Sequence, residues 1–145
     1  MLAPQRPLGE PPAPIPGRIA VVGVCASGKS VLVAKLRALG YDARSCAQEH
    51  SCVPDMWQRL SRPQILIYLD ASAQTVLERR SLGNVEDVLR QERQRLAHAR
   101  KHCHIYLPTD TLSEARVLEI ALCHLRTLGL FPPRSDTERD TREPL

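Results

Sequence analysis

The sequence predicts an α/β protein with three layers, in which helices cover both faces of a small, mainly parallel sheet of about four strands. Two observations predict this class. Short apolar runs rich in Val and Ile alternate along the chain with longer runs that have a helical period. Parallel strands need such crossover helices, and the right-handed sense of the crossovers restricts the topology. The length of 145 residues fits one domain.

Four runs predict the strands of this sheet. They are Arg18–Val22, Asp42–Ala47, Gln64–Leu69 and Cys103–Leu107. Five further runs predict helices. These are Val31–Leu39, Val53–Leu60, Ala73–Arg80, Val85–Lys101 and Ser113–Leu128, with Ser113 as the N-cap of the last helix and Gly129 beyond its end. Aromatic residues make up only 3% of the chain, so the core between these layers must be aliphatic.

Both ends of the chain differ in composition from its middle. Residues 1–17 hold six prolines, which exclude a helix or a central strand, so we expect a disordered N-terminal arm. Residues 132–145 are polar and have no apolar period, so we expect a disordered C-terminal tail. The folded domain is therefore predicted over residues 18–131.

A phosphate-binding loop is predicted directly after the first strand. Residues 23–30 read Gly-Val-Cys-Ala-Ser-Gly-Lys-Ser and fit the pattern G-x-x-x-x-G-K-[ST], with a strand before it and a helix after it. The glycines let the backbone turn tightly, and the loop N–H groups and the start of the helix attract an anion. The predicted nucleotide-binding residues of the loop are Gly23, Val24, Cys25, Ala26, Ser27, Gly28, Lys29, Ser30 and Val31.

The last two residues of the motif predict ATP and Mg²⁺ as ligands. Lys29 places a positive charge on the β- and γ-phosphates, and the Ser30 hydroxyl ligates Mg²⁺. An N-K-x-D guanine signature is missing from the sequence, so ATP is favoured over GTP. Glu49 lies near the end of the second strand and is a candidate base for a substrate hydroxyl; the alternative is a carboxylate near a helix start that faces solvent. Asp70 follows the hydrophobic third strand, as a Walker B acid would, and we favour the alternative that it caps the next helix together with Ser72.

The basic residues are concentrated in one stretch. Residues 79–101 contain seven basic and three acidic side chains, so this stretch alone accounts for the chain's net charge of +4. Arg79 and Arg80 end a predicted helix close to the loop, and we expect them to contact phosphate. The alternatives are a solvated helix face with ion pairs such as Asp87–Arg90 and Glu92–Arg95, or a patch that binds nucleic acid. The stretch has no interleaved aromatic residues, which argues against nucleic acid.

The composition also predicts a cytoplasmic location. No apolar run approaches about 18 residues, so no membrane span is expected, and the N-terminus lacks the apolar core of a signal peptide. The five cysteines form no C-x-x-C pair and are interpreted as reduced thiols.

Three segments together resemble the superfamily of P-loop nucleoside and nucleotide kinases, which includes shikimate-, thymidylate- and adenylate-kinase-like proteins. They are the loop at 23–30, the run Ile65–Ser72 with the helix that ends in Glu78-Arg79-Arg80, and the run Tyr106–Ser113. The resemblance covers most of residues 17–128 and implies the fold of P-loop NTPases. It also implies that Thr109 and Asp110 lie near the adenine and that Arg79 and Arg80 are lid residues. Only about fifteen residues, 49–63, separate the second and third strands, so the chain would be a compact variant.

The leading hypothesis is transfer of the ATP γ-phosphoryl group to a small-molecule acceptor, a nucleoside, a nucleotide or another metabolite. The residues expected to act are Lys29, Glu49, Arg79 and Arg80. The alternative is a non-catalytic module that binds ATP or GTP as a switch or assembly signal, with the proline-rich arm bound to a protein partner. Nucleic-acid binding by residues 79–101 is the third hypothesis. The sequence does not identify the acceptor.

Overall fold

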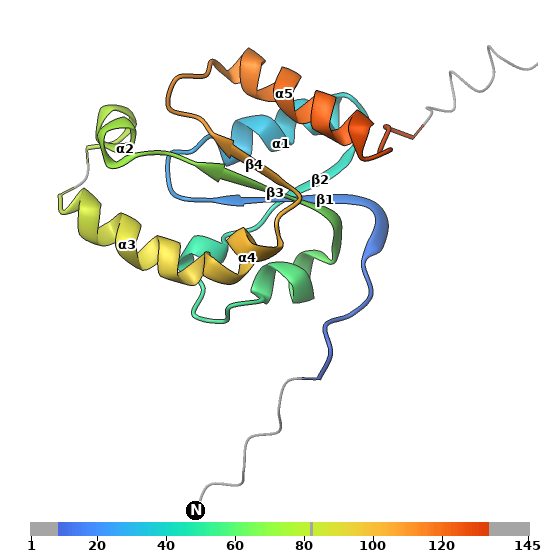
Figure 1. The fold of residues 1–145 in the computed structure, drawn as a ribbon, viewed down its shortest axis with the longest axis horizontal. Coiled ribbons are helices and arrows are strands. Elements are labelled where there is room, and N and C mark those ends of the chain that lie inside the picture. Colours follow the sequence, from blue (N-terminus) through green and yellow to red (C-terminus); the bar gives the residue numbers. More distant parts are fainter. Residues whose placement is uncertain (1–8, 82, 134–145) are drawn as a thin grey trace, which may run out of the picture.

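The structure, a computed structural model, describes residues 9–81 and 83–133 and confirms the predicted fold class. One four-stranded sheet has the order β2-β1-β3-β4, and every neighbouring pair of strands is parallel (Figure 1). The strands are β1 (Ile15–Gly23), β2 (Asp42–Ser45), β3 (Pro63–Asp70) and β4 (Ile105–Pro108). Because all four run in the same direction, their carboxyl ends meet at one edge of the sheet.

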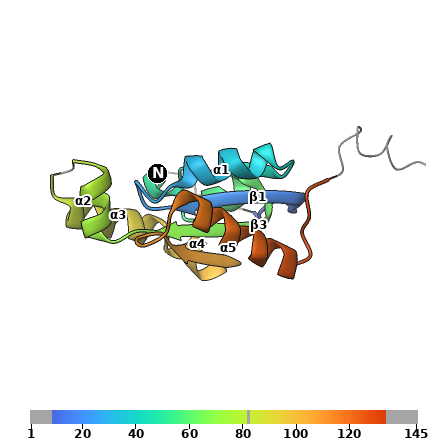
Figure 2. The same ribbon diagram turned by 90° about the horizontal axis from the view of Figure 1, so that it is seen from above.

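Helices cover both faces of the sheet. They are α1 (Lys29–Ala38), α2 (Ala73–Arg79), α3 (Val85–Arg95), α4 (Ala97–His102) and α5 (Glu114–Thr127), with a 3₁₀ turn η1 (Gln48–His50) and a π-helical turn η2 (Trp57–Ser61). In Figure 1, α1 and α5 lie above the sheet, whereas α3, α4 and residues 48–61 lie below it. Helix α2 lies beyond the carboxyl ends of the strands in both Figure 1 and Figure 2.

The two faces of β1 show why this arrangement forms. Ile19 and Val21 belong to the buried cluster shared with α1 and α5, whereas Ala20 and Val22 belong to the cluster shared with α3 and α4. Alternate residues of a strand point to opposite faces, so a continuous apolar run is what a strand covered on both sides requires. The core is mainly aliphatic, as predicted from the composition.

The first strand begins at Ile15, three residues earlier than predicted, so the expected N-terminal arm does not extend to residue 17. The Ile15 N–H donates to the Arg62 carbonyl over 2.8 Å, and the Gly17 N–H donates to Gln64 Oε1 over 2.6 Å. The Arg62 guanidinium also binds the Ala13 carbonyl. These contacts to a segment about fifty residues away hold the proline-rich chain against the sheet. The rest of the expected arm, residues 1–8, and most of the expected tail, residues 134–145, lie outside the described residues.

The helical predictions differ from the structure where Gln48 enters the interior. Its fully buried carboxamide accepts from the Trp57 N–H (2.8 Å) and donates to the carbonyls of Val53 (2.8 Å) and Arg95 (3.1 Å). The expected helix over residues 53–60 is therefore a turn followed by the short η2. The expected helix over residues 85–101 is two helices that meet at Leu96. No helix in the described part of the chain is long and apolar enough to cross a membrane.

A histidine beside the only tryptophan makes the stability of the folded state depend on pH. Trp57 Nε1–H donates to His98 Nδ1 over 3.1 Å, and burial together with neighbouring His102 lowers the pKa of His98, while Asp55 opposes this shift. Since the unfolded chain takes up the proton first, stability should be full above about pH 6.5 and fall as the pH drops below it. Urea unfolding at about pH 7.5 and pH 5.5 measures this loss.

The matched variant is His98→Gln, which keeps an acceptor for Trp57 but does not titrate. We expect it to lose less stability between the two pH values than the wild type. Some loss will remain, because burial also lowers the pKa of His104. An equal loss in both proteins would contradict this role of His98.

Candidate functional site

The predicted phosphate-binding loop connects β1 to α1, and its backbone explains two of its residues. A Cβ at Gly23 would overlap the Leu69 carbonyl of β3, so only glycine lets the two strand ends approach this closely. Gly28 precedes α1 with φ 97°, a left-handed conformation that favours glycine. Ala26 also has a positive φ, 58°, which costs a residue with a Cβ about 1–2 kcal/mol. The loop is therefore held in a shape that its backbone alone does not favour.

Lys29 and Glu49 form a buried ion pair at the centre of the site. Lys29 Nζ lies 2.6 Å from Glu49 Oε2 and donates to the carbonyls of Gly23 (2.9 Å) and Val24 (3.0 Å). The two side chains are only 12% and 5% exposed. All three N–H donors of the ammonium group are therefore used, and the pair joins the loop to η1 beyond the end of β2.

Two buried polar atoms beside this pair have no partner in the described part of the chain. They are Glu49 Oε1 and the Ser27 hydroxyl. Buried polar groups are nearly always hydrogen-bonded, so each exception calls for an explanation. Glu49 and the exposed Ser30 line one cavity of about 410 Å³, and Ser27 lines it too. A ligand in this cavity would lie beside both residues.

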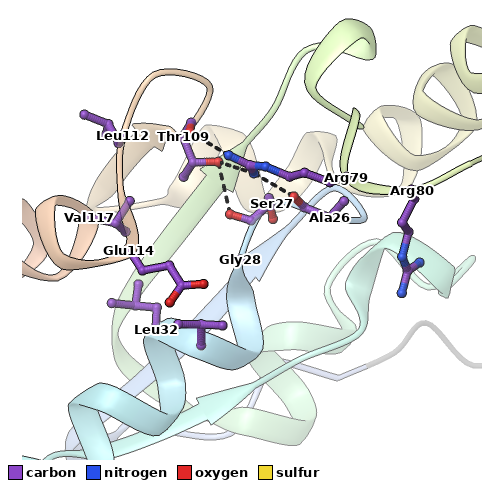
Figure 3. A pocket seen from close by; sticks show the side chains of 11 residues that line it. Ala26, Ser27, Gly28, Leu32, Arg79, Arg80, Thr109, Leu112, Glu114 and Val117 are labelled. Atoms are coloured by element: carbon purple, nitrogen blue, oxygen red, sulfur yellow. Dashed lines mark hydrogen bonds between the residues drawn. The ribbon is translucent and has the colours of Figure 1, made fainter. Parts of the chain in front are cut away.

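A second cavity, of about 310 Å³, lies on the other side of the loop, towards α1 and α5 (Figure 3). Leu32, Leu112 and Val117 form an apolar wall of this cavity. Its polar lining includes Arg79 and Thr109, which the sequence predicted at the site, together with Ser27, Arg80 and Glu114. The cavity thus combines an apolar wall with a few directed polar groups, as sites for small molecules commonly do.

Arg79 and Thr109 are bonded directly to the loop. Arg79 Nη1 donates to the Ala26 carbonyl over 2.7 Å, and Nη2 donates to the Thr109 carbonyl over 2.9 Å. The buried Thr109 hydroxyl lies 3.1 Å from the Ser27 carbonyl, to which it donates. The segment after β4 and the end of α2 are therefore tied to the phosphate loop, although neither is close to it in sequence.

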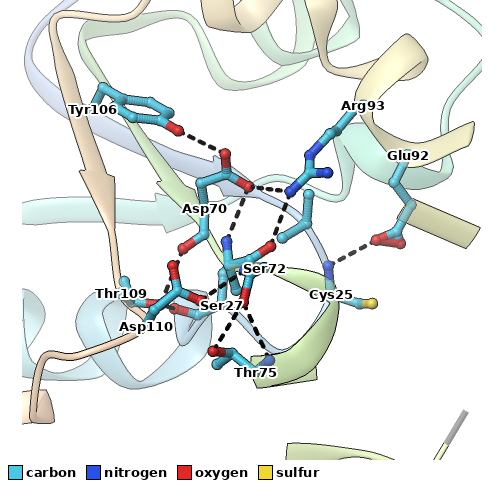
Figure 4. A network of polar contacts seen from close by, with 12 residues as sticks. Cys25, Ser27, Asp70, Ser72, Thr75, Glu92, Arg93, Tyr106, Thr109 and Asp110 are labelled. Carbon is cyan, nitrogen blue, oxygen red and sulfur yellow. Dashed lines mark hydrogen bonds and ion pairs between the residues drawn. The ribbon is translucent and has the colours of Figure 1, made fainter. Parts of the chain in front are cut away.

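Asp110 is not brought into either cavity. Its Oδ1 accepts from the Ser72 N–H over 2.7 Å, and hydrogen bonds from Thr75 and Ser72 lower the pKa of its carboxyl group (Figure 4). Ser72 itself caps α2, because its hydroxyl accepts from the Thr75 N–H. Asp110 therefore serves the start of α2, and its placement near an adenine, which the resemblance implied, stays a prediction.

Asp70 has a different role from the helix cap that we predicted. Its Oδ2 accepts from the Tyr106 hydroxyl over 2.6 Å, and its Oδ1 accepts from the Ala71 N–H and lies 3.3 Å from Arg93 Nη2 (Figure 4). The carboxylate thus links the ends of β3 and β4 to α3. Only the Ser72 half of the predicted cap is correct.

Glu92 is the residue of this region that sequence reasoning missed. Its side chain is 2% exposed and its Oε1 accepts from the Cys25 N–H over 2.8 Å. Burial and this carboxylate raise the pKa of the Cys25 thiol to about 11. The predicted pairing of Glu92 with Arg95 is wrong, because Arg95 donates to the Glu49 carbonyl instead. Charge spacing along α3 gave no signal for a partner 67 residues away.

Among the expected arginines, Arg80 is the one left available. It lines both cavities, and in the described part of the chain its side chain forms neither an ion pair nor a hydrogen bond within the protein. The predicted pair of Arg90 with Asp87 is confirmed at 3.0 Å on the exposed face of α3. No cluster of three or more His, Cys, Asp or Glu side chains within residues 9–81 and 83–133 is placed to hold a metal.

Comparison of the chain with models of known protein families gives no match, and comparison with curated protein sequences gives none either.

The contact between Glu92 and the loop can be tested by its effect on stability. Glu92→Ala leaves the buried Cys25 N–H without an acceptor, so we expect a loss of about 1–3 kcal/mol of unfolding free energy. Glu92→Gln keeps an acceptor oxygen and should lose clearly less. Urea denaturation of the three proteins measures both changes, and equal losses in the two variants would show that the hydrogen bond to Cys25 contributes little.

Proposed function

We propose that this protein binds Mg·ATP at the loop between β1 and α1 and transfers the γ-phosphoryl group to a small-molecule acceptor, as a compact relative of the P-loop kinases. The observation that carries the proposal is the buried pair that Lys29, from a loop of the G-x-x-x-x-G-K-[ST] pattern, forms with Glu49 of η1. A cation and a carboxylate with one free oxygen then lie side by side where the phosphates would bind.

The phosphates would replace the protein groups that Lys29 binds in this structure. Its ammonium group binds two loop carbonyls and one carboxylate oxygen, each of which a phosphate oxygen can replace. The start of α1 adds its unpaired N–H groups and the positive end of the helix dipole. Transfer of the phosphoryl group then depends mainly on position and charge neutralisation.

The apolar cavity on the α1–α5 side fits the base. Leu32, Leu112 and Val117 can cover one face of an adenine, and the planar guanidinium of Arg79 lies across the cavity's rim. In this proposal Arg79 contacts the base rather than the phosphates, in contrast to our expectation from the sequence. Thr109 acts by holding Arg79 and the loop together.

Mg²⁺ fits the chemistry of the opposite side. The Ser30 hydroxyl is exposed at the start of α1 and lines the same cavity as Glu49, so it would hold the ion together with phosphate oxygens. When bound, Mg²⁺ neutralises the charge on the phosphates. In this proposal Glu49 Oε1, which is buried and has no partner in the described part of the chain, would accept a proton from an acceptor hydroxyl.

One observation favours the second candidate, a non-catalytic nucleotide-binding module. The other oxygen of Glu49 is bound to Lys29, so the carboxylate already has a structural partner within the protein. Binding of nucleic acid by residues 79–101 has less support. Arg93 is bonded to Asp70, Arg95 to the Glu49 carbonyl, and the Arg100 guanidinium lies 3.7 Å from the ring centre of Tyr106.

Variants of Lys29 and Glu49 should distinguish nucleotide binding from phosphoryl transfer. We expect Lys29→Ala to weaken Mg·ATP binding at least about tenfold in calorimetry, because a charge-assisted contact to phosphate is lost. Glu49→Gln should bind Mg·ATP at least as well as the wild type, yet transfer phosphoryl about 10²–10⁴ times more slowly in single-turnover assays. Circular dichroism checks that each variant is folded.

The double variant Lys29→Met/Glu49→Gln is the control for folding, since it leaves no buried charge without a partner. If it binds Mg·ATP like the wild type, Lys29 has no part in nucleotide binding and the proposal fails. If the Glu49→Gln single variant transfers phosphoryl at the normal rate, Glu49 is not the base.

A further inference from the structure

We infer that the acceptor is a small anionic alcohol, a hydroxyl compound that carries a carboxylate or a phosphate. This inference rests on the proposed function and concerns the cavity of about 410 Å³ on the β2 side of the loop. The end of β2, η1 and the end of α2 surround this cavity. The residues that matter for its chemistry are Ser27, Glu49, His50 and Arg80.

Arg80 supplies the positive charge that would bind the anionic group. It follows the last residue of α2 and has no partner within the described part of the protein. Its charge acts at the loop, since Arg80 and Lys29 both oppose the rise in the pKa of Cys25. In Figure 3 its side chain points in a different direction from that of Arg79, and Arg80 lines both cavities. An unpaired guanidinium matches a carboxylate or phosphate with two parallel hydrogen bonds.

The cavity walls do not suit a nucleobase. Within the described part of the chain no Phe, Tyr or Trp side chain lines this cavity, its one ring is the imidazole of the exposed His50, and Val31 is its largest aliphatic residue. The only tryptophan, Trp57, is buried and bonded to His98 instead. Recognition of a base needs an aromatic or apolar face to stack against. The acceptor is therefore a small hydrophilic molecule rather than a nucleoside or nucleotide.

The position of Glu49 indicates that the reacting group of the acceptor is a hydroxyl. Its free Oε1 is buried at the loop, next to the position proposed for the γ-phosphate, and Arg80 lines the same cavity. An acceptor hydroxyl would give its proton to Glu49 while its oxygen forms a bond to the γ-phosphorus. The bond between that phosphorus and the β,γ-bridging oxygen breaks, so the products are ADP and a phosphate monoester. Glu49 then returns the proton to water.

The first experiment measures ADP formation from Mg·ATP with three groups of acceptors. Glycerate and gluconate carry a carboxylate, glycerol 3-phosphate and ribose 5-phosphate carry a phosphate, and glycerol, ribose, uridine and adenosine carry no charge. We expect one of the two anionic groups to show at least about tenfold higher kcat/KM than its uncharged counterparts, because the contact to Arg80 is charge-assisted. The preferred group identifies the anion.

The second experiment compares variants on the best acceptor. Arg80→Ala should raise its KM about 10- to 100-fold with little change in kcat, and Arg80→Lys should recover part of that loss. Arg90→Ala, which removes an exposed arginine of α3, is the matched control and should change nothing. Calorimetry of the acceptor against protein saturated with Mg·ADP should show the same loss of affinity in Arg80→Ala without any turnover.

The outcomes separate this inference from the proposed function. If Mg·ATP binds but uridine or adenosine is preferred, or no anionic alcohol is phosphorylated, the acceptor class is wrong and nucleotide binding stands. An equal fall in kcat for all acceptors in Arg80→Ala would place Arg80 on the transferring phosphoryl group and also overturn the inference. If Mg·ATP does not bind, the proposed function fails and the inference fails with it.

Discussion

The buried pair of Lys29 and Glu49 is the interaction on which the rest of the site depends. Removing two charges from water is unfavourable, and their attraction compensates only where further hydrogen bonds complete the pair. Here two loop carbonyls accept the other two hydrogen bonds of the ammonium group, whereas one oxygen of the carboxylate has no partner in the described part of the chain. The pair thus fixes the loop to η1 and leaves one strong acceptor for a ligand.

The strand order explains why distant segments reach this pair. Because β1 lies between β2 and β3, the loop that follows it is flanked by η1 on one side and by the ends of β3 and β4 on the other. Thr109 then reaches the Ser27 carbonyl from 82 residues away, and Glu92 reaches the Cys25 N–H from below the sheet. Several elements thus hold a loop that contains a strained alanine.

The two cavities beside the loop differ in chemistry, and this difference supports the proposal that one binds the base and the other the acceptor. The one towards α1 and α5 has an aliphatic wall, whereas the one towards β2 is lined mainly by small and polar residues. Arg79 and Arg80 are adjacent in sequence, yet Arg79 is bonded at the first cavity, whereas Arg80 lines both cavities and has no partner in the described part of the chain. A helix that ends between them directs the two side chains apart.

The sequence by itself determined the features that depend on neighbouring residues. Short runs between turn signals predicted all four strands, apolar residues with a helical period predicted the position of most helices, and the glycine spacing located the loop, because these patterns act through the local backbone. Only the tertiary structure decided the long-range pairings. The early start of β1 at Ile15, the contact of Glu92 with the loop and the turn of Asp110 towards Ser72 all pair groups more than thirty residues apart. Such pairs form because buried polar groups need partners, and packing, not sequence spacing, brings the partners within reach.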